Sequence, residues 1–128
     1  MTVDLQMLVY SSLFCFVLVL INILGGMTTI GLPPLLGDRA GFPELPGWAG
    51  RSSRTHRNML ENLVPFAAIV LTAHIADKID ATAILGTQIF FYARIVHAIC
   101  YIGAINLLRP LAWGAGVFGT ILVALPLI

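Results

Sequence analysis

The organisation of this chain is decided by one stretch, which has the sequence Arg51-Ser-Ser-Arg-Thr-His-Arg-Asn-Met-Leu-Glu-Asn-Leu-Val-Pro-Phe66. It places three arginines, a histidine, two asparagines and a glutamate against the start of a long apolar run. Charged side chains at the start of a membrane segment are costly, and those that occur there are normally functional. The stretch therefore predicts a membrane-spanning helix with a polar site near one of its ends.

Helical periodicity brings four of these residues together. On a helix of 3.6 residues per turn, Arg54, Asn58, Glu61 and Pro65 are spaced i, i+4, i+7 and i+11, which places them in one narrow stripe. Asn62 lies at the edge of this stripe. The stripe can therefore converge on a single ligand.

The composition places the whole chain in a membrane. Of its residues 59% are hydrophobic and only 10% are charged, which is too apolar for a soluble domain of 128 residues. No charged side chain occurs from Leu5 to Gly37. At about 1.5 Å per residue, the part from Leu5 to Met27 alone exceeds the roughly 30 Å hydrocarbon core. Because no basic residue precedes this run, we expect a retained span and not a cleaved signal peptide.

Three further apolar segments follow, so we expect an all-α integral membrane four-helix bundle formed as one domain by residues 1–128. A loop rich in glycine and proline follows the first span and is predicted to be irregular. Pro110 marks the start of the last span, since proline suits the first turn of a helix and not its interior. The predicted spans are Leu5–Met27, Asn58–Ala76, Ala81–Leu107 and Leu111–Ile128.

The cations are distributed unevenly along the chain, and this predicts the orientation of the spans. The first and third loops, with the segments beside them, carry all the arginines outside the spans, whereas the second loop has only Lys78. Since cytoplasmic loops are enriched in Lys and Arg, the first and third loops are predicted to be cytoplasmic and both termini to lie outside. The arginines concerned are Arg39, Arg51, Arg54, Arg57 and Arg109.

Two classes of ligand are not expected. A formal net charge of only +1 argues against nucleic acid, because phosphate binding needs a dense basic face. Cys15 and Cys100 lie far apart in predicted spans, without the spacing of a metal site or a disulfide framework. We therefore expect neither a metal ion nor a nucleic-acid partner.

A second polar stripe lies on the third predicted span, where Arg94, His97 and Tyr101 follow i, i+3, i+7 spacing. An arginine at bilayer depth costs at least about 2.5 kcal/mol, so Arg94 needs a partner. Glu61 is the one acid inside any predicted span, and we expect the two stripes to face each other through an Arg94–Glu61 pair. The alternative is a pair that only joins the helices, without a ligand.

Several of the polar residues are also compatible with a structural role that involves no ligand. Arg51 and Arg57 are also compatible with solvated cations of a cytoplasmic loop. His56, like Arg57, points away from the centre of the first stripe, toward a neighbouring helix or the aqueous boundary. His97 is also compatible with a hydrogen-bonded core histidine, and Arg109 with an anchor at the membrane interface.

Together, Arg54 to Phe66, Ala93-Arg-Ile-Val-His-Ala-Ile-Cys-Tyr101 and Arg109-Pro-Leu-Ala-Trp113 resemble the MAPEG superfamily, the membrane-associated proteins in eicosanoid and glutathione metabolism. The resemblance is closer to the microsomal glutathione transferase branch. It implies a homotrimer of four-helix bundles, with glutathione as co-substrate at each subunit interface near the cytosolic side. It also implies a detoxification activity on lipophilic electrophiles.

The resemblance extends to single residues. Arg54, Asn58 and Glu61 match the family's glutathione contacts on the second span. Arg94, His97 and Tyr101 match its contacts on the third span. Arg109 resembles the arginine that stabilises the glutathione thiolate, with Arg94 as the alternative. The candidate glutathione-binding residues are Arg51, Arg54, His56, Asn58, Glu61, Asn62, Arg94, His97 and Tyr101.

Two functions remain open. The first is a glutathione transferase or peroxidase, in which a partly desolvated arginine lowers the pKa of a thiol that is near 8.5 in model compounds. The second is a non-enzymatic membrane protein of the same family that binds a lipid or a partner protein. A transporter or channel is disfavoured, because a short polar stripe near one face makes no continuous pathway.

Overall fold

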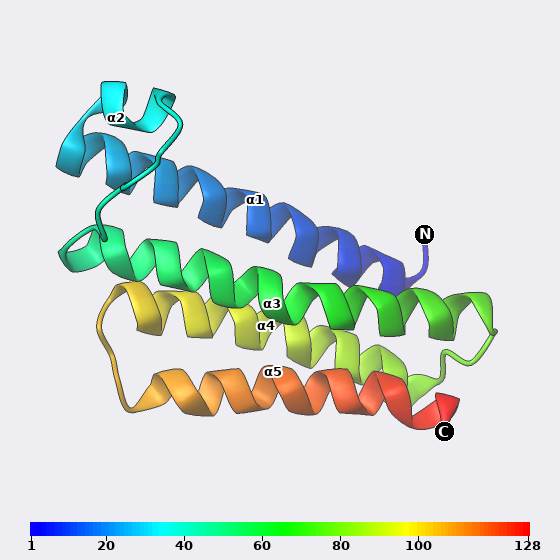
Figure 1. Ribbon diagram of the computed structural model, residues 1–128. Coiled ribbons are helices and arrows are strands. Elements are labelled where there is room, and N and C mark those ends of the chain that lie inside the picture. Colours follow the sequence, from blue (N-terminus) through cyan, green and yellow to red (C-terminus); the bar gives the residue numbers. More distant parts are fainter.

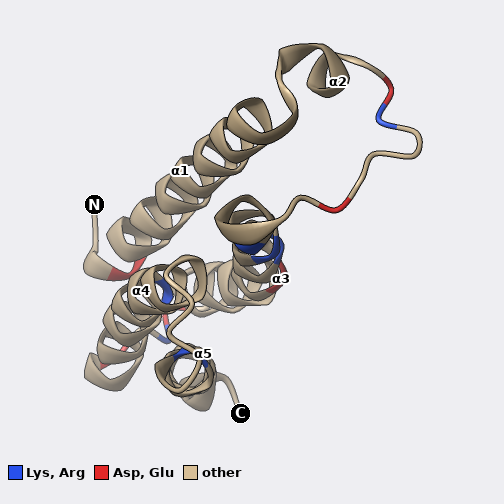
Figure 2. Cartoon of the chain, turned by 90° about the vertical axis from the view of Figure 1, so that its left-hand side faces the viewer, with Lys and Arg blue, Asp and Glu red and all other residues tan.

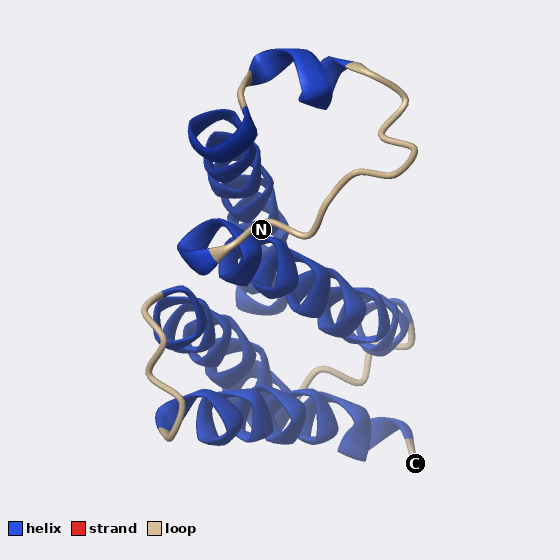
Figure 3. Cartoon of the chain, turned by 60° about the vertical axis from the view of Figure 1, so that its left-hand side comes forward, coloured by secondary structure: helices blue, strands red, loops and turns tan.

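The structure, a computed structural model, describes all residues from Met1 to Ile128 and contains helices but no strands (Figures 1 and 3). The helices are α1 (Val3–Ile30), α2 (Leu32–Leu36), α3 (Gly47–Ile75), α4 (Ala81–Ile102) and α5 (Leu108–Ala124), and a 3₁₀ turn, η1 (Leu125–Leu127), follows them. Four of the helices, α1, α3, α4 and α5 with its final turn, are long and apolar enough to cross a membrane. The prediction of an all-α, four-span architecture is confirmed.

The charged stretch belongs to a helix over its whole length. The sequence predicted that the second span begins near Asn58, but α3 begins at Gly47. Two polar side chains in its first turns bond back to the helix backbone: Ser52 Oγ donates to the Ala49 carbonyl at 2.7 Å and Thr55 Oγ1 to the Arg51 carbonyl at 2.7 Å. These hydroxyls make their hydrogen bonds within the helix, so the polar stretch is compatible with a helix that begins before the apolar run.

The loops also differ from their predicted limits. The first loop, predicted to be irregular, contains the short helix α2, whose first turn holds Pro33 and Pro34, where the missing proline N–H costs nothing. Helix α4 ends at Ile102 and not at Leu107, because Gly103 and Ala104, the latter at φ 60°, turn the chain. Pro110 lies in the first turn of α5, as predicted.

The four long helices run side by side in alternating directions (Figure 1). The first loop and the α4–α5 turn lie at one end of the bundle, which we call the loop end. Both termini and the α3–α4 turn lie at the other end. Helix α1 packs mainly on α3 and α5 mainly on α4, while α3 and α4 also contact each other. The two helices that carry the polar stripes are therefore neighbours.

An aromatic pair joins the two halves of the bundle. The rings of Phe66 on α3 and Phe90 on α4 are stacked, with centroids 3.6 Å apart and planes 6° from parallel. Both side chains are fully buried, in one core that also includes Leu18 of α1 and Val123 of α5. Such stacking adds about 0.5–1.5 kcal/mol to the burial of the rings. It fixes the separation of α3 and α4, on which the polar site depends.

Helices α4 and α5 approach so closely that they require glycine at their crossing. A Cβ at Gly86 would lie 2.5 Å from the Gly119 carbonyl oxygen, and a Cβ at Gly119 would lie 2.6 Å from that of Gly86. Small residues at such crossings let the backbones of membrane helices pack against each other. Gly114, also on α5, has no atom within 4 Å of its would-be Cβ and serves as a control position.

We predict that Gly119→Ala destabilises the protein by about 1–3 kcal/mol, because the added methyl group meets backbone that cannot move aside. Gly114→Ala should instead be neutral or stabilising by up to about 1 kcal/mol, since alanine is the better helix former. The measurement is the unfolding transition of both variants in the same detergent. Equal transitions for the two variants would show that α4 and α5 do not cross at this glycine pair.

Candidate functional site

The centre of the polar site is Arg94, a cation that is only 1% exposed. Its Nη2 donates to Asn58 Oδ1 on α3 at 2.5 Å and to His97 Nδ1 on its own helix at 3.3 Å. A guanidinium has donors only, so His97 Nδ1 is the acceptor and the imidazole proton lies on Nε2. The two polar stripes therefore face each other, as predicted.

A glycine on α5 makes room for the arginine. A Cβ at Gly116 would lie 3.3 Å from Arg94 Cδ, which is a tight contact. The aliphatic part of Arg94 therefore crosses α5 where that helix has no side chain. The sequence reasoning missed Gly116, and a glycine among apolar residues gives no signal by which it could have been chosen.

Arg94 retains two donors without a partner. Its Nε and Nη1 atoms are buried and make no hydrogen bond. Leaving buried donors unpaired costs about 1–3 kcal/mol for each group, and more where the group is charged. No carboxylate of this chain forms an ion pair with Arg94. The site is thus a buried positive charge with two free donors, an arrangement that suits an anionic group.

The predicted Arg94–Glu61 pair is wrong for this chain. Asn58 takes the place of the acid, while Glu61 is exposed and makes no ion pair. The two residues are only three positions apart, but Asn58 is half-buried on the inner edge of the stripe, whereas Glu61 lies on its outer edge. The stripe is therefore divided between the interior of the bundle and its outer surface.

The polar contacts continue along α4 to the loop end. The rings of His97 and Tyr101 form a T-shaped pair, with centroids 5.6 Å apart and planes at 76°. The guanidinium carbon of the half-buried Arg109 lies 4.8 Å from the centroid of the Tyr101 ring, a cation–π contact between α5 and α4. Asn58, Arg94, His97, Tyr101 and Arg109 thus form one continuous row across three helices, which we call the polar row.

Two of the other predicted site residues have partners elsewhere. Arg54 is exposed, and its Nη1 forms an ion pair with Glu44 Oε1 of the first loop at 2.7 Å. Arg51 Nε donates to the Ile102 carbonyl at 2.8 Å, so this arginine joins the start of α3 to the end of α4. Neither the Glu44 nor the Ile102 contact was foreseen, because both depend on how the loops fold.

The remaining predicted residues lie on α3 beside the polar row. Asn62 Nδ2 donates to the Asn58 carbonyl at 2.8 Å, which orients Asn62 along its own helix. His56 is half-buried and makes no side-chain hydrogen bond or ion pair. The cations of the site mark α3, α4 and α5 when the bundle is viewed from its loop end (Figure 2). The structure therefore brings Asn58, Arg94, His97, Tyr101 and Arg109 together and leaves Arg54, His56 and Glu61 outside direct contact with them.

We predict that Asn58→Leu lowers the stability of the protein by about 2 kcal/mol or more, because hydrogen bonds to charged groups contribute about 1.5–3 kcal/mol. Glu61→Gln should not destabilise the ligand-free protein, since Glu61 has no partner within the chain. Thermal unfolding of both variants in detergent without added ligand distinguishes the two sites. A larger loss for Glu61→Gln than for Asn58→Leu would restore the Arg94–Glu61 pair.

Comparisons with known proteins identify a family for this chain and relatives that match part of it. The family model described as MAPEG family matches residues 7–128. Microsomal glutathione S-transferase 1 from Homo sapiens is 42% identical over 52 residues, and the protein of the same name from Bos taurus is 44% identical over 52 residues. Each match covers 41% of this chain and 34% of the relative, about a third of its length. No solved structure matches.

Proposed function

The chain belongs to the MAPEG family, and from this premise we propose that it is a membrane-bound glutathione transferase or peroxidase that acts on lipophilic electrophiles. The observation that carries the proposal is Arg94, a buried cation with two unpaired donors in the row that joins α3, α4 and α5. The curated relatives, named as glutathione transferases, support the same substrate. Glutathione is then a co-substrate of this site.

The chemical groups of glutathione fit the polar residues one by one. The molecule carries two carboxylates, an ammonium and a thiol. The free N–H groups of Arg94 suit an anionic group, and charge-assisted hydrogen bonds of this kind are the strong ones. Arg54 and His56 offer donors for a carboxylate nearer the loop end, and Glu61 is the matching acceptor for the ammonium. Asn62, Arg51, His97 and Tyr101 border this path.

Arg109 is our choice for the group that activates the thiol. It is half-buried at the mouth of the bundle, held over the Tyr101 ring, and lies in the first turn of α5. A nearby cation and the N-terminal end of a helix both favour a thiolate over a thiol. The thiolate then attacks the electrophilic carbon of the second substrate and forms an S–C bond, while the displaced group takes the electron pair. Arg94 is the alternative activator.

We further propose that the protein is a homotrimer whose subunits complete the site between them. Arg54, Arg57 and Glu61 are exposed along α3 beside the exposed Val64. A charged face at membrane depth is costly against lipid, so a neighbouring subunit is the suitable cover. The mass of the complex in detergent, corrected for bound detergent, should equal three chains. A monodisperse monomer that still binds glutathione would contradict a shared site.

We also propose that the loop end faces the cytoplasm. Both the first loop and the α4–α5 turn lie there, with Arg39, Arg51, Arg54 and Arg109 in or near them. The opposite end has Lys78 as its one Lys or Arg residue. This asymmetry follows the positive-inside rule and places glutathione binding on the cytoplasmic side.

We predict that Arg109→Ser removes the glutathione thiolate at neutral pH, while glutathione binding changes by no more than a few-fold because Arg94 and Arg54 remain. The check is the ultraviolet absorbance band of the thiolate, which the protonated thiol lacks. At low pH, the conjugation rate should fall about tenfold for each unit by which the thiol pKa rises. The rate should recover at high pH, where the thiol ionises without help.

Lys78→Ser is the control, because Lys78 lies in the α3–α4 turn, at the end of the bundle opposite to Arg109. It should leave the thiolate absorbance in place. An unchanged signal in Arg109→Ser would move the role to Arg94. A missing signal in the unmodified protein, together with no heat of glutathione binding in a calorimetric titration, would contradict the enzyme and favour a non-enzymatic lipid- or partner-binding protein of the family.

A further inference from the structure

His97 of the polar row is placed to act on Arg94. The two residues lie three positions apart on α4, so that their side chains share one face of the helix. His97 is only 2% exposed, and its Nδ1 atom lies 3.3 Å from Arg94 Nη2. This is the one side-chain hydrogen bond that His97 makes within the chain. Its imidazole ring therefore has one engaged nitrogen and one free nitrogen.

The free nitrogen of the ring carries the proton. A guanidinium only donates hydrogen bonds, so Nδ1 accepts from Arg94 and Nε2 is the protonated atom. A second proton on the ring would set two donors against each other and would place two positive charges side by side. His97 is therefore a neutral imidazole in the Nε2–H tautomer, and its acceptor is directed at Arg94.

Asn58 and His97 together occupy one nitrogen of Arg94. A guanidinium has five N–H donors, of which two belong to Nη2. Asn58 Oδ1 and His97 Nδ1 accept hydrogen bonds from this nitrogen at 2.5 Å and 3.3 Å. The remaining N–H groups, on the buried Nε and Nη1 atoms, have no partner. The paired side of the guanidinium therefore determines where its unpaired side lies.

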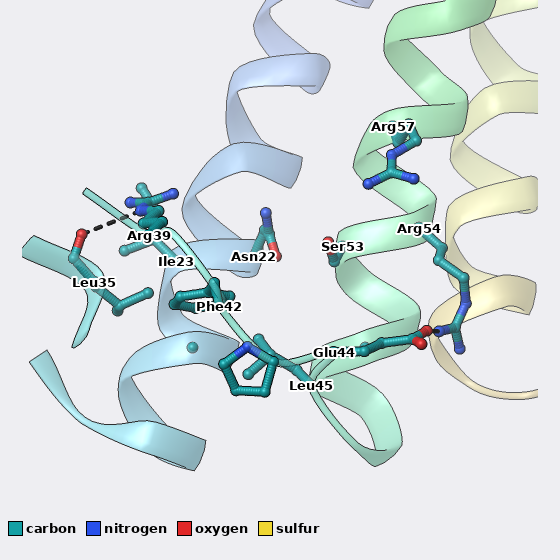
Figure 4. Close-up of a pocket in the computed structure, with 13 residues that line it drawn as sticks. Asn22, Ile23, Leu35, Arg39, Phe42, Glu44, Leu45, Ser53, Arg54 and Arg57 are labelled. Atoms are coloured by element: carbon teal, nitrogen blue, oxygen red, sulfur yellow. Dashed lines mark hydrogen bonds and ion pairs between the residues drawn. The ribbon is translucent and has the colours of Figure 1, made fainter. Parts of the chain in front are cut away.

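No acid of the chain positions Arg94. Arg54, by contrast, turns toward Glu44 of the first loop, with 2.7 Å between Nη1 and Oε1 (Figure 4). Arg94 has no ion pair, and its aliphatic part passes Gly116, whose would-be Cβ lies 3.3 Å from Arg94 Cδ. The tip of the Arg94 side chain is therefore held only by its two neutral acceptors.

Loss of one acceptor would let the guanidinium turn about the remaining hydrogen bond. A ligand would then have to order the side chain as it binds, and this ordering costs free energy. A donor that is held in place before the ligand arrives therefore binds more tightly. Because His97 lies on α4 and Asn58 on α3, the two acceptors fix the guanidinium relative to both helices.

We propose that His97 is a positioning residue, whose Nδ1 orients Arg94 so that Nε and Nη1 face the bound co-substrate. This inference rests on the proposed function, because glutathione is the ligand concerned. His97 acts through Arg94 and not on the sulfur. Its contribution should therefore appear in the affinity for glutathione and not in the ionisation of the thiol, which we assign to Arg109.

The test uses three variants that separate the two ring nitrogens. Asparagine places an amide oxygen close to the position of Nδ1, glutamine places its amide near that of Nε2, and leucine offers no acceptor. In calorimetric titrations with glutathione, His97→Asn should bind nearly as tightly as the unmodified protein. His97→Gln and His97→Leu should lose about tenfold to a hundredfold, as expected for a hydrogen bond to a charged group. Tyr92→Phe, which removes a hydroxyl from an exposed side chain of α4, should change nothing.

Two further readouts distinguish positioning from other roles. With glutathione at saturation, the thiolate absorbance should persist in all three variants, because Arg109 is unchanged. In the ligand-free protein, nitrogen NMR of isotope-labelled histidine should show the Nε2–H tautomer for His97, whose signal is the one that His97→Asn lacks. If His97→Leu does not fold, the asparagine and glutamine variants still decide the question.

The outcomes separate this inference from the proposed function. Tighter binding by His97→Gln than by His97→Asn would assign His97 to direct ligand contact through Nε2 and overturn the proposal. The Nδ1–H tautomer, equal affinities for all variants, or loss of the thiolate band at saturation would also overturn it. No binding of glutathione by the unmodified protein would instead overturn the proposed function, and this inference with it.

Discussion

The arrangement of this bundle depends on one buried cation and its contact across two helices. Arg94 enters the interior from α4, and Asn58 of α3 accepts its hydrogen bond at 2.5 Å. An arginine buried without such a partner would strongly destabilise the fold. The contact requires α3 and α4 to be adjacent, which the Phe66–Phe90 stack secures, and it requires space beside α5, which Gly116 provides. The apolar packing and the hydrogen bond of Arg94 therefore require the same relative positions of α3, α4 and α5.

Helix α3 has two polar edges, one facing the interior of the bundle and one exposed on its surface. Its inner edge, with Asn58, completes the environment of Arg94. Its outer edge, with Arg54 and Glu61, is exposed on the single chain, and the first loop covers only part of it through Glu44. Charges of this kind in a membrane protein need a partner, a ligand or a second subunit. The outer edge is therefore where ligand binding and assembly of subunits would meet.

Much of this could be predicted from the sequence, because the signals are long and repeated. Four apolar segments define four spans, and the spacing of Asn58, Arg94, His97 and Tyr101 places them on facing sides of two helices. The identity of the partner of Arg94 could not be predicted. Asn58 and Glu61 differ by about 60° around a helix of 3.6 residues per turn, and periodicity alone does not fix which edge points inward.

Other features could not be predicted from the sequence, because they arise from backbone and loop geometry. The early start of α3 includes polar residues whose hydroxyl groups bond back to the helix backbone, and the partner of Arg51 is a main-chain carbonyl at the end of α4. The Gly86–Gly119 crossing depends on the relative position of two helices. Sequence patterns indicate which residues share a helix face, whereas these contacts depend on the position and angle at which two helices pack against each other.

The measurement that tests this account most directly is an experimental structure of the protein with bound glutathione. The account predicts an oxygen or the sulfur of glutathione within hydrogen-bond distance of Arg94 Nε or Nη1, with Nη2 still bonded to Asn58. A structure in which Arg94 pairs with Glu61 of its own chain or a neighbouring one, and glutathione lies away from the polar row, would contradict it.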